Sequence, residues 1–221
     1  MTEFKICGIA KTEHAIAART YGACWIGFVF VPGVRREISV EKVKDIIAQY
    51  RDLTGPGGPG IVGLFANQTL REVNSISEQC ELDYVQLCGD EDDAYWSQLD
   101  FSIIRQIKVA SVGDRPQIVD SLRQQVENVL EKDAIPLLDR LEKGKLGGTG
   151  QSFDWSVAAE LPDDWDYMVA GGLDPSNVMD AINKLNPWAV DVSSGVETNG
   201  KKDTSKIREF ANKVISIDIP K

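Results

Sequence analysis

Hydrophobic and polar positions fall into blocks along the chain, with short apolar blocks separated by longer amphipathic ones. The short blocks are nearly all apolar, as expected for strands that are buried on both faces of a parallel sheet. The pattern predicts eight strands, at Phe4–Cys7, Trp25–Phe30, Ile61–Phe65, Tyr84–Leu87, Ile103–Val109, Ile135–Leu138, Tyr167–Ala170 and Ala189–Val192.

The amphipathic blocks between these strands predict helices. In one block, Val40, Val43, Ile46 and Ile47 fall on a single helical face. The segments Asp92–Leu99 and Ser156–Leu161 have weaker helical patterns. The clearest helices are predicted at Glu13–Tyr21, Val40–Tyr50, Leu70–Cys80, Gln117–Val129, Asn177–Leu185 and Ser205–Val214.

Eight strands that alternate with helices over residues 1–221 favour an α/β fold, a single (β/α)8 TIM barrel domain. An open doubly wound sheet is the alternative, but no GxGxxG fingerprint follows the first strand. The run TGPGGPG, Thr54 to Gly60, leads from a helix into a strand. We therefore expect it on the amino-terminal face of the barrel, as a flexible connection.

Composition narrows the classes of function. The formal net charge of −10 argues against a nucleic-acid-binding surface, which needs clustered lysine and arginine. No run of about 18 apolar residues predicts a membrane span, and the amino terminus lacks the pattern of a signal peptide. The four cysteines form no CxxC pair and no metal-ligand spacing, so reduced thiols in a cytoplasmic protein are predicted.

In a barrel of this kind, chemistry is expected at the carboxyl ends of the strands, and phosphate is often held after the last two. The seventh predicted strand ends in Gly171 and Gly172, and the eighth is followed by Ser193, Ser194 and Gly195. Glycine allows backbone N–H groups to approach an anion closely. These loops therefore predict a phosphate cup, although each alone is equally consistent with a tight turn.

Two further strand ends carry reactive side chains. Cys7 ends the first strand, where nearby cations could make its thiol a base, although a buried cysteine is more often only a small apolar residue. Asp139 closes the run IPLLD, either as a loop cap or as an acid whose pKa is raised by partial burial. His14 lies in the first helical pattern and is expected at the surface.

Taken together and in order, the strand-end motifs resemble those of phosphoribosylanthranilate isomerase, an enzyme family of tryptophan biosynthesis. The resemblance extends from Lys5 to about Val214, and it is specific as a combination although each motif alone is weak. The motifs are KICG (5–8), GFVF (27–30), VGLF (62–65), VQLCGDE (85–91), PLLD (136–139), GGTGQSFDW (147–155), AGGL (170–173) and VDVSSGVETNGKKD (190–203).

The resemblance implies a (β/α)8 barrel that works without a metal or another cofactor. It implies the Amadori rearrangement of N-(5-phosphoribosyl)anthranilate to 1-(2-carboxyphenylamino)-1-deoxyribulose 5-phosphate. By similarity, Asp139 is the general acid that protonates the furanose ring oxygen. Cys7 is the general base that removes the proton from C2 of the sugar.

The resemblance also implies how the phosphorylated substrate is bound. Arg36 matches the arginine that engages the anthranilate carboxylate, and a guanidinium suits this task through its bidentate geometry. The AGGL and VSSG loops match the phosphate cup, and Asp191 is expected to order that end of the eighth strand. The GGTG run, Gly147–Gly150, is expected to cover the mouth of the barrel.

This chain departs from the family pattern at two places. The family often has a serine two residues before the arginine, whereas here Val34 stands there and Arg35 precedes Arg36, so either arginine could meet the carboxylate. The family usually has VQLHG, whereas here Cys88 replaces the histidine. Because that histidine is neither the acid nor the base, the reaction is expected to survive.

Other sugar-phosphate barrels are the nearest alternatives. Indole-glycerol-phosphate synthase would need a lysine acid, and no strand end has one at a matching position. The dual-substrate isomerase that also serves histidine synthesis would need an aspartate where Cys7 stands. A non-catalytic barrel that binds a phosphometabolite would have no reason to keep Cys7 and Asp139 together. Whether the chain is a monomer or a homodimer stays open.

Overall fold

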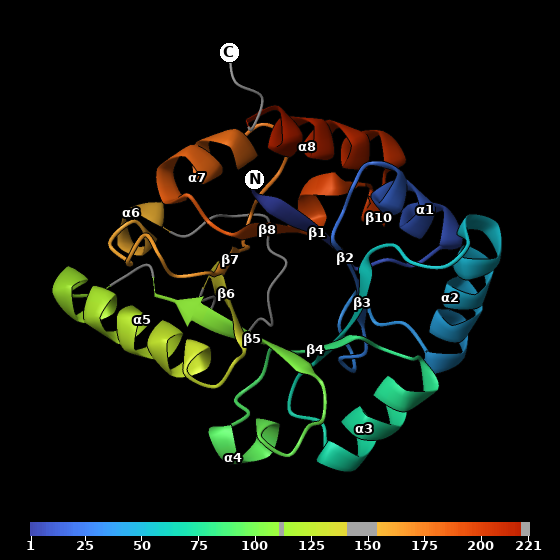
Figure 1. Ribbon diagram of the computed structural model, residues 1–221, viewed down its shortest axis with the longest axis horizontal. Coiled ribbons are helices and arrows are strands. Elements are labelled where there is room, and N and C mark those ends of the chain that lie inside the picture. Colours follow the sequence, from blue (N-terminus) through green and yellow to red (C-terminus); the bar gives the residue numbers. More distant parts are fainter. Residues whose placement is uncertain (111–112, 141–153, 218–221) are drawn as a thin grey trace.

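Eight parallel strands close into a barrel in the order β1 to β8, each strand paired with its neighbour and β8 paired with β1. The computed structural model describes residues 1–110, 113–140 and 154–217. Seen along the barrel axis, the strands form a central ring and the helices an outer layer (Figure 1). The strands are β1 (Glu3–Cys7), β2 (Trp25–Val29), β3 (Gly60–Phe65), β4 (Tyr84–Leu87), β5 (Ser102–Val109), β6 (Ile135–Arg140), β7 (Met168–Val169) and β8 (Ala189–Val192).

The helices follow the predicted pattern, and the two weaker predictions correspond to single turns, α4 and α6. A short 3₁₀ turn, η1 (Ser194–Val196), follows β8 and leads into an antiparallel ribbon of β9 (Glu197–Thr198) and β10 (Lys201–Lys202) that the sequence pattern did not predict. The α-helices are α1 (Thr12–Thr20), α2 (Val40–Thr54), α3 (Leu70–Gln79), α4 (Asp93–Trp96), α5 (Arg115–Leu130), α6 (Trp155–Ala158), α7 (Val178–Leu185) and α8 (Thr204–Ile217).

Local chemistry explains where two of these helices begin. The Ser39 side chain caps α2 by accepting a hydrogen bond from the Lys42 N–H. At α3, the Thr69 hydroxyl accepts from the Glu72 N–H while the Glu72 carboxylate accepts from the Thr69 N–H, which is a capping box. These caps fix where each helix begins, in the connections that follow β2 and β3.

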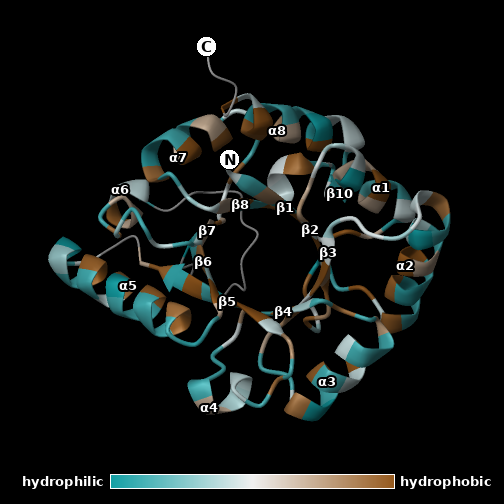
Figure 2. Ribbon diagram, viewed as in Figure 1, coloured by the Kyte–Doolittle hydropathy of each residue, from teal (hydrophilic) through white to brown (hydrophobic). Residues whose placement is uncertain are grey.

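The apolar side chains form two cores. One core fills the space between the barrel and the helices, and Figure 2 shows hydrophobic colours on the inner sides of the helices. The second core lies inside the barrel, where alternate side chains of each strand point. Trp25 belongs to this inner core and packs edge-on against Trp188, with their ring centroids 5.1 Å apart. Side chains therefore fill the barrel, which is not a pore.

The prediction for His14 is wrong, because its side chain is buried rather than exposed. His14 is 3% exposed in α1, and burial lowers its pKa, so the neutral imidazole is favoured. The glycine-rich connection between α2 and β3 lies on the amino-terminal side of the strands, as predicted. Among the described residues, no helix is both long enough and apolar enough to cross a membrane.

Candidate active site

Cys7 is the last residue of β1, and its thiol is buried inside the barrel. Gly27 on β2 leaves room for it, because a Cβ at that glycine would lie 3.2 Å from Cys7 Sγ. Burial raises the pKa of the Cys7 thiol, whereas the positive charge of Lys5 lowers it. Lys202 and Arg36 also lower this pKa. The structure therefore places the predicted base among cationic groups.

Lys5 and Asp191 form a buried ion pair between β1 and β8. Their Cα atoms are partners in the parallel ladder, and Lys5 Nζ donates to Asp191 Oδ1 at 2.9 Å. Burial by itself lowers the pKa of Lys5, but the charge and hydrogen bond of Asp191, together with Cys7 and Cys88, outweigh this and raise the pKa to about 12. Lys5 thus stays protonated at neutral pH, two residues from the thiol. Asp191, predicted to order this end of β8, is held by a charged partner.

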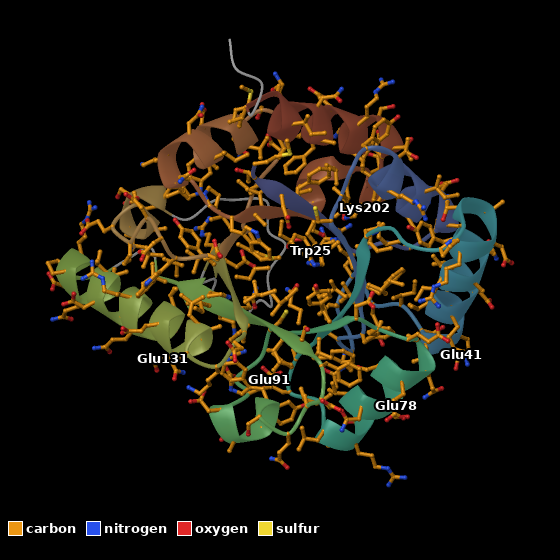
Figure 3. The ribbon with its side chains drawn as sticks, in the orientation of Figure 1. Trp25, Glu41, Glu78, Glu91, Glu131 and Lys202 are labelled. Atoms are coloured by element: carbon orange, nitrogen blue, oxygen red, sulfur yellow. The ribbon has the colours of Figure 1, made fainter. Side chains whose placement is uncertain are left out.

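Glu197 on β9 gathers three cations at the same end of the barrel. Its carboxylate accepts from Arg36 Nε at 2.6 Å, from Arg35 Nη2 at 2.7 Å and from Lys202 Nζ at 2.7 Å. Figure 3 labels Lys202, which lies on β10 beside β1. The loop after β2 and the loop after β8 are therefore tied together through one carboxylate.

The structure separates the roles of the two neighbouring arginines. The Arg36 side chain is 16% exposed, whereas that of Arg35 is 52% exposed. A Cβ at Gly8 would lie 2.8 Å from Arg36 Cδ, so Arg36 packs against the end of β1. Arg35 instead donates to the carbonyl of Gly200 in the turn between β9 and β10. Of the two, Arg36 is the one that borders the Cys7 strand end.

Asp139 lies inside the barrel near the end of β6 and is 8% exposed. Gln106 Nε2 on β5 donates to Asp139 Oδ2 at 2.6 Å, and the Arg140 N–H donates to Oδ1 at 2.7 Å. Burial raises the pKa of the carboxyl to about 6, although both hydrogen bonds favour the ionised form. Asp139 thus has the raised pKa that the predicted acid requires.

The two predicted phosphate loops pack against each other and against Asp139. Gly171 and Gly172 have φ angles of +83° and +69°, a backbone conformation that favours glycine. A Cβ at Gly195 would lie 1.9 Å from the Leu173 carbonyl oxygen, so only glycine fits between the loops. A Cβ at Gly171 would lie 2.7 Å from Asp139 Oδ1. The predicted cup is thus adjacent to the predicted acid.

The serines after β8 connect the cup to the base. Ser193 Oγ donates to the Cys7 carbonyl oxygen at 3.1 Å, and Lys202 Nζ donates to the Ser193 carbonyl oxygen at 2.9 Å. Ser194 begins η1, and its neighbour Gly195 continues this turn. The structure therefore brings every site residue predicted from the sequence to one end of the barrel.

Four polar residues of this region were not assigned a role from the sequence, namely Lys5, Gln106, Glu197 and Lys202. A usable signal was the charge of Lys5 within an otherwise apolar strand, since a lysine is rarely buried without a partner. Gln106 and Glu197 had no local signal because their partners Asp139 and Arg36 are distant in the sequence, and Lys202 had none because the β9–β10 ribbon was not predicted. The GGTG run lies outside the described residues. Among the described residues, no cluster of three or more His, Cys, Asp or Glu side chains could hold a metal ion.

Comparison with known proteins gives a consistent result. The family model described as N-(5'phosphoribosyl)anthranilate (PRA) isomerase matches residues 4–213. N-(5'-phosphoribosyl)anthranilate isomerase of Dehalococcoides mccartyi is 41% identical over 218 residues, which cover 99% of this chain and 98% of that protein. The enzyme of Magnetococcus marinus is 42% identical over 212 residues, covering 94% and 92% of the two chains.

Solved structures agree with the sequence comparisons. The crystal structure of phosphoribosyl anthranilate isomerase from Thermotoga maritima has a TM-score of 0.81 and 31% identity, and the match covers 98% of this chain and 100% of that one. A phosphoribosyl anthranilate isomerase crystallised with reduced 1-(o-carboxyphenylamino)-1-deoxyribulose 5-phosphate has a TM-score of 0.76 and 30% identity, with the same coverage. The chain therefore belongs to the N-(5'-phosphoribosyl)anthranilate isomerase family.

Proposed function

We propose that this chain converts N-(5-phosphoribosyl)anthranilate to 1-(2-carboxyphenylamino)-1-deoxyribulose 5-phosphate with Asp139 as general acid and Cys7 as general base. The observation that carries the assignment is the contrast between their surroundings. Burial raises the pKa of both groups, to about 6 at Asp139, whereas at Cys7 the charges of Lys5, Lys202 and Arg36 oppose the rise and favour the thiolate. Membership of the isomerase family supports the reaction itself.

The reaction requires one proton to be given and another to be taken. Asp139 donates its proton to the furanose ring oxygen, the bond from C1 to that oxygen breaks, and the anthranilate nitrogen supplies electrons to form an iminium ion. The Cys7 thiolate then removes the proton from C2, and those electrons neutralise the iminium to give an enolamine. Protonation at C1 and loss of the enol proton give the 2-ketone.

The pKa values of the two groups predict how activity depends on pH. The productive form pairs a thiolate with a carboxylic acid, although Asp139 titrates near pH 6 and the pKa of Cys7 is raised above its ordinary value of 9.0. Between the two pKa values, a rise in pH increases the fraction of Cys7 thiolate by the same factor by which it decreases the fraction of protonated Asp139. The fraction of enzyme in the productive form therefore stays constant. We therefore expect kcat/KM, which reports the free enzyme, to fall below about pH 6 and again above the pKa of Cys7.

The remaining groups fit the ends of the substrate. Arg36 is expected to hold the anthranilate carboxylate, since its guanidinium borders the Cys7 strand end. The loops that contain Gly171, Gly172 and Gly195 are expected to bind the phosphate with their backbone N–H groups. A relative of this chain was crystallised with a reduced phosphorylated product, which supports a phosphorylated small molecule as the substrate.

A fluorescence assay tests the reaction and both roles. N-(5-phosphoribosyl)anthranilate is generated in the cuvette, and the loss of its fluorescence is followed. The wild type is expected to turn over, and Cys7→Ala and Asp139→Asn to lower kcat by about 10²- to 10⁴-fold. An unchanged kcat in either variant would contradict the assignment of its role. If the wild type does not turn over the substrate, a phosphate-binding barrel without this reaction becomes the better interpretation.

Two matched variants separate chemistry from folding. Cys80→Ala removes a buried thiol at the end of α3, on the helix side of the barrel. Asp133→Asn changes an exposed residue before β6, at a φ angle of +54° that asparagine tolerates. Both are expected to keep full activity. Cytoplasmic location and the choice between monomer and homodimer stay predictions, and light scattering tests the latter.

A further inference from the structure

Among the described residues, the Gln106 side chain donates a hydrogen bond to the Asp139 carboxyl, and the other donor is a backbone N–H. Gln106 lies on β5 and is 8% exposed, and its Nε2 donates to Asp139 Oδ2 at 2.6 Å. The other oxygen, Oδ1, accepts from the Arg140 N–H and faces the backbone of Gly171. A backbone N–H can only donate, so Oδ1 must remain an acceptor. When the carboxyl gains a proton, that proton therefore belongs on Oδ2, next to Gln106.

The other half of the Gln106 amide is unused. Within the described residues, Gln106 Oε1 is buried without a hydrogen-bond partner, and such groups in a native structure call for an explanation. A primary amide carries two donors and an acceptor on nearly equal arms. Turning it over about its last side-chain bond replaces Nε2 by Oε1 opposite Asp139 Oδ2. The same side chain can thus donate to a carboxylate and accept from a carboxylic acid.

We propose that Gln106 is a positioning residue for the acid, which holds Asp139 Oδ2 in both protonation states by turning its amide over. The inference rests on the proposed function, because a general acid passes through both states in each turnover. Losing Gln106 removes a donor to the ionised form, and hydrogen bonds to an ion are stronger than those to a neutral group. The balance at Asp139 should then move toward the protonated acid.

Other charged groups also face this carboxyl. Asp191 on β8 raises the pKa of Asp139, and Lys5 on β1 lowers it. On β5 itself, Lys108 lies two residues beyond Gln106, with Nζ 3.8 Å from Asp90 Oδ1. All of these groups are unchanged in a Gln106 variant, so a shift in such a variant reports on the amide.

The direct test follows the Asp139 carboxyl by NMR and needs no turnover. Protein labelled with ¹³C at the aspartate carboxyl carbons is titrated, and the Asp139 signal is assigned with Asp139→Asn. Gln106→Met keeps the length of the side chain but removes its hydrogen bond. We expect the midpoint for Asp139 to rise by about one to two pH units, the scale of one hydrogen bond to a charged group. The low-pH limb of kcat/KM should move with it.

Gln86→Met is the matched control. Gln86 also lies inside the barrel, on the neighbouring strand β4, and its Oε1 is also buried without a partner within the described residues, but its Nε2 donates to Cys88 Sγ. This variant should leave the midpoint of Asp139 unchanged. An unchanged midpoint in folded Gln106→Met, or an equal shift in Gln86→Met, would overturn the proposal.

A second measurement uses the wild type and does not depend on the stability of a variant. The side-chain N–H signals of Gln106 are followed by ¹⁵N NMR through the same titration. They should move with the midpoint of Asp139 in the wild type and stay constant in Asp139→Asn. Constant signals in the wild type would show that the Gln106 amide does not respond to protonation of Asp139, which also overturns the proposal. Because neither measurement needs substrate, a failed isomerase assay would be a separate result.

Discussion

Two carboxyl groups at the same end of the barrel, Asp139 and Glu197, have pKa values shifted in opposite directions. Burial raises the pKa of Asp139 to about 6. Burial also acts to raise the pKa of Glu197, but hydrogen bonds from Arg36, Lys202 and Arg35 outweigh it and hold the pKa at about 2. Asp139 is buried with neutral hydrogen-bond partners, whereas Glu197 is half-buried among three cations, so burial and partners together decide which carboxyl becomes an acid and which a permanent anion.

The difference divides the mouth of the barrel into two electrostatic halves. Around β1 and β2, cations favour anions, which suits a thiolate base and the carboxylate of a substrate. Around β6, the hydrogen-bond partners of Asp139 are a neutral amide and a backbone N–H, which leaves the acid able to hold its proton. The two halves thus favour the opposite charge states that a base and an acid need, although burial keeps the Cys7 thiol mostly protonated at neutral pH.

Removing the charge of Glu197 should produce the largest effect on stability. Glu197→Gln leaves Lys202 and Arg36 beside each other without their shared anion, and both side chains are largely buried. We expect the free energy of unfolding to fall by about 3–5 kcal/mol at neutral pH, as for a broken buried ion pair. Urea unfolding monitored by circular dichroism measures this loss.

The pH dependence and a control sharpen this test. Because the folded pKa of Glu197 lies below its unfolded value, its stabilisation is full above about pH 4.5 and is lost as the pH falls toward 2. The difference between wild type and Glu197→Gln should therefore shrink in acid. Glu13→Gln removes an exposed partner of Lys11 and should change stability far less. Equal losses of unfolding free energy in Glu197→Gln and Glu13→Gln would contradict a special role of Glu197 in holding the cations around β1 and β2.

The opposite sign is predicted for Asp139. Its folded pKa of about 6 exceeds the ordinary value of 3.8, so its contribution to stability is fully present below about pH 4 and is lost as the pH rises through 6. Asp139→Asn cannot ionise, and it should be more stable than the wild type by about 3 kcal/mol at pH 8, from a shift of about two units. At pH 4 the two should be equal. Urea midpoints that show the same difference at both pH values would refute this explanation.

The barrel and the positions of the two groups proposed as base and acid could be predicted from the sequence, because both depend on local order. Apolar runs place the strands, and Cys7 and Asp139 stand where those runs end. The ion pair of Lys5 with Asp191 spans 186 positions, and no local pattern reports on such a contact. Glu197 lies in a short ribbon beside Lys202, and its other two cationic partners, Arg35 and Arg36, come from the distant loop after β2. His14 was misjudged because helical spacing alone does not show which neighbours cover a side chain.

Arg36 and Arg35 both lie in the cationic half, the region around β1 and β2, and substitutions test which of them binds the substrate carboxylate. Arg36→Lys keeps the charge but loses the planar fork, so we expect the KM for substrate to rise about tenfold, which corresponds to about 1.4 kcal/mol. Arg35→Lys changes a more exposed side chain that holds the Gly200 carbonyl, and KM should stay within about twofold. The measurement is KM from initial rates, with kcat from the same curves. A larger effect at Arg35 would reverse the assignment of the anthranilate carboxylate.

The smallest effect is expected at Cys88, the residue that replaces the family histidine. Burial raises the pKa of its thiol to about 12, so this thiol stays neutral, and Gln86 Nε2 donates to its Sγ at 3.4 Å. A serine can accept the same hydrogen bond in nearly the same space, so kcat/KM of Cys88→Ser should stay within about threefold of wild type. Cys7→Ser, a chemically identical change on β1, should cost 10²-fold or more because it replaces the base. Comparable losses of kcat/KM in Cys88→Ser and Cys7→Ser would show that Cys88 takes part in catalysis. The cationic half would then extend to β4.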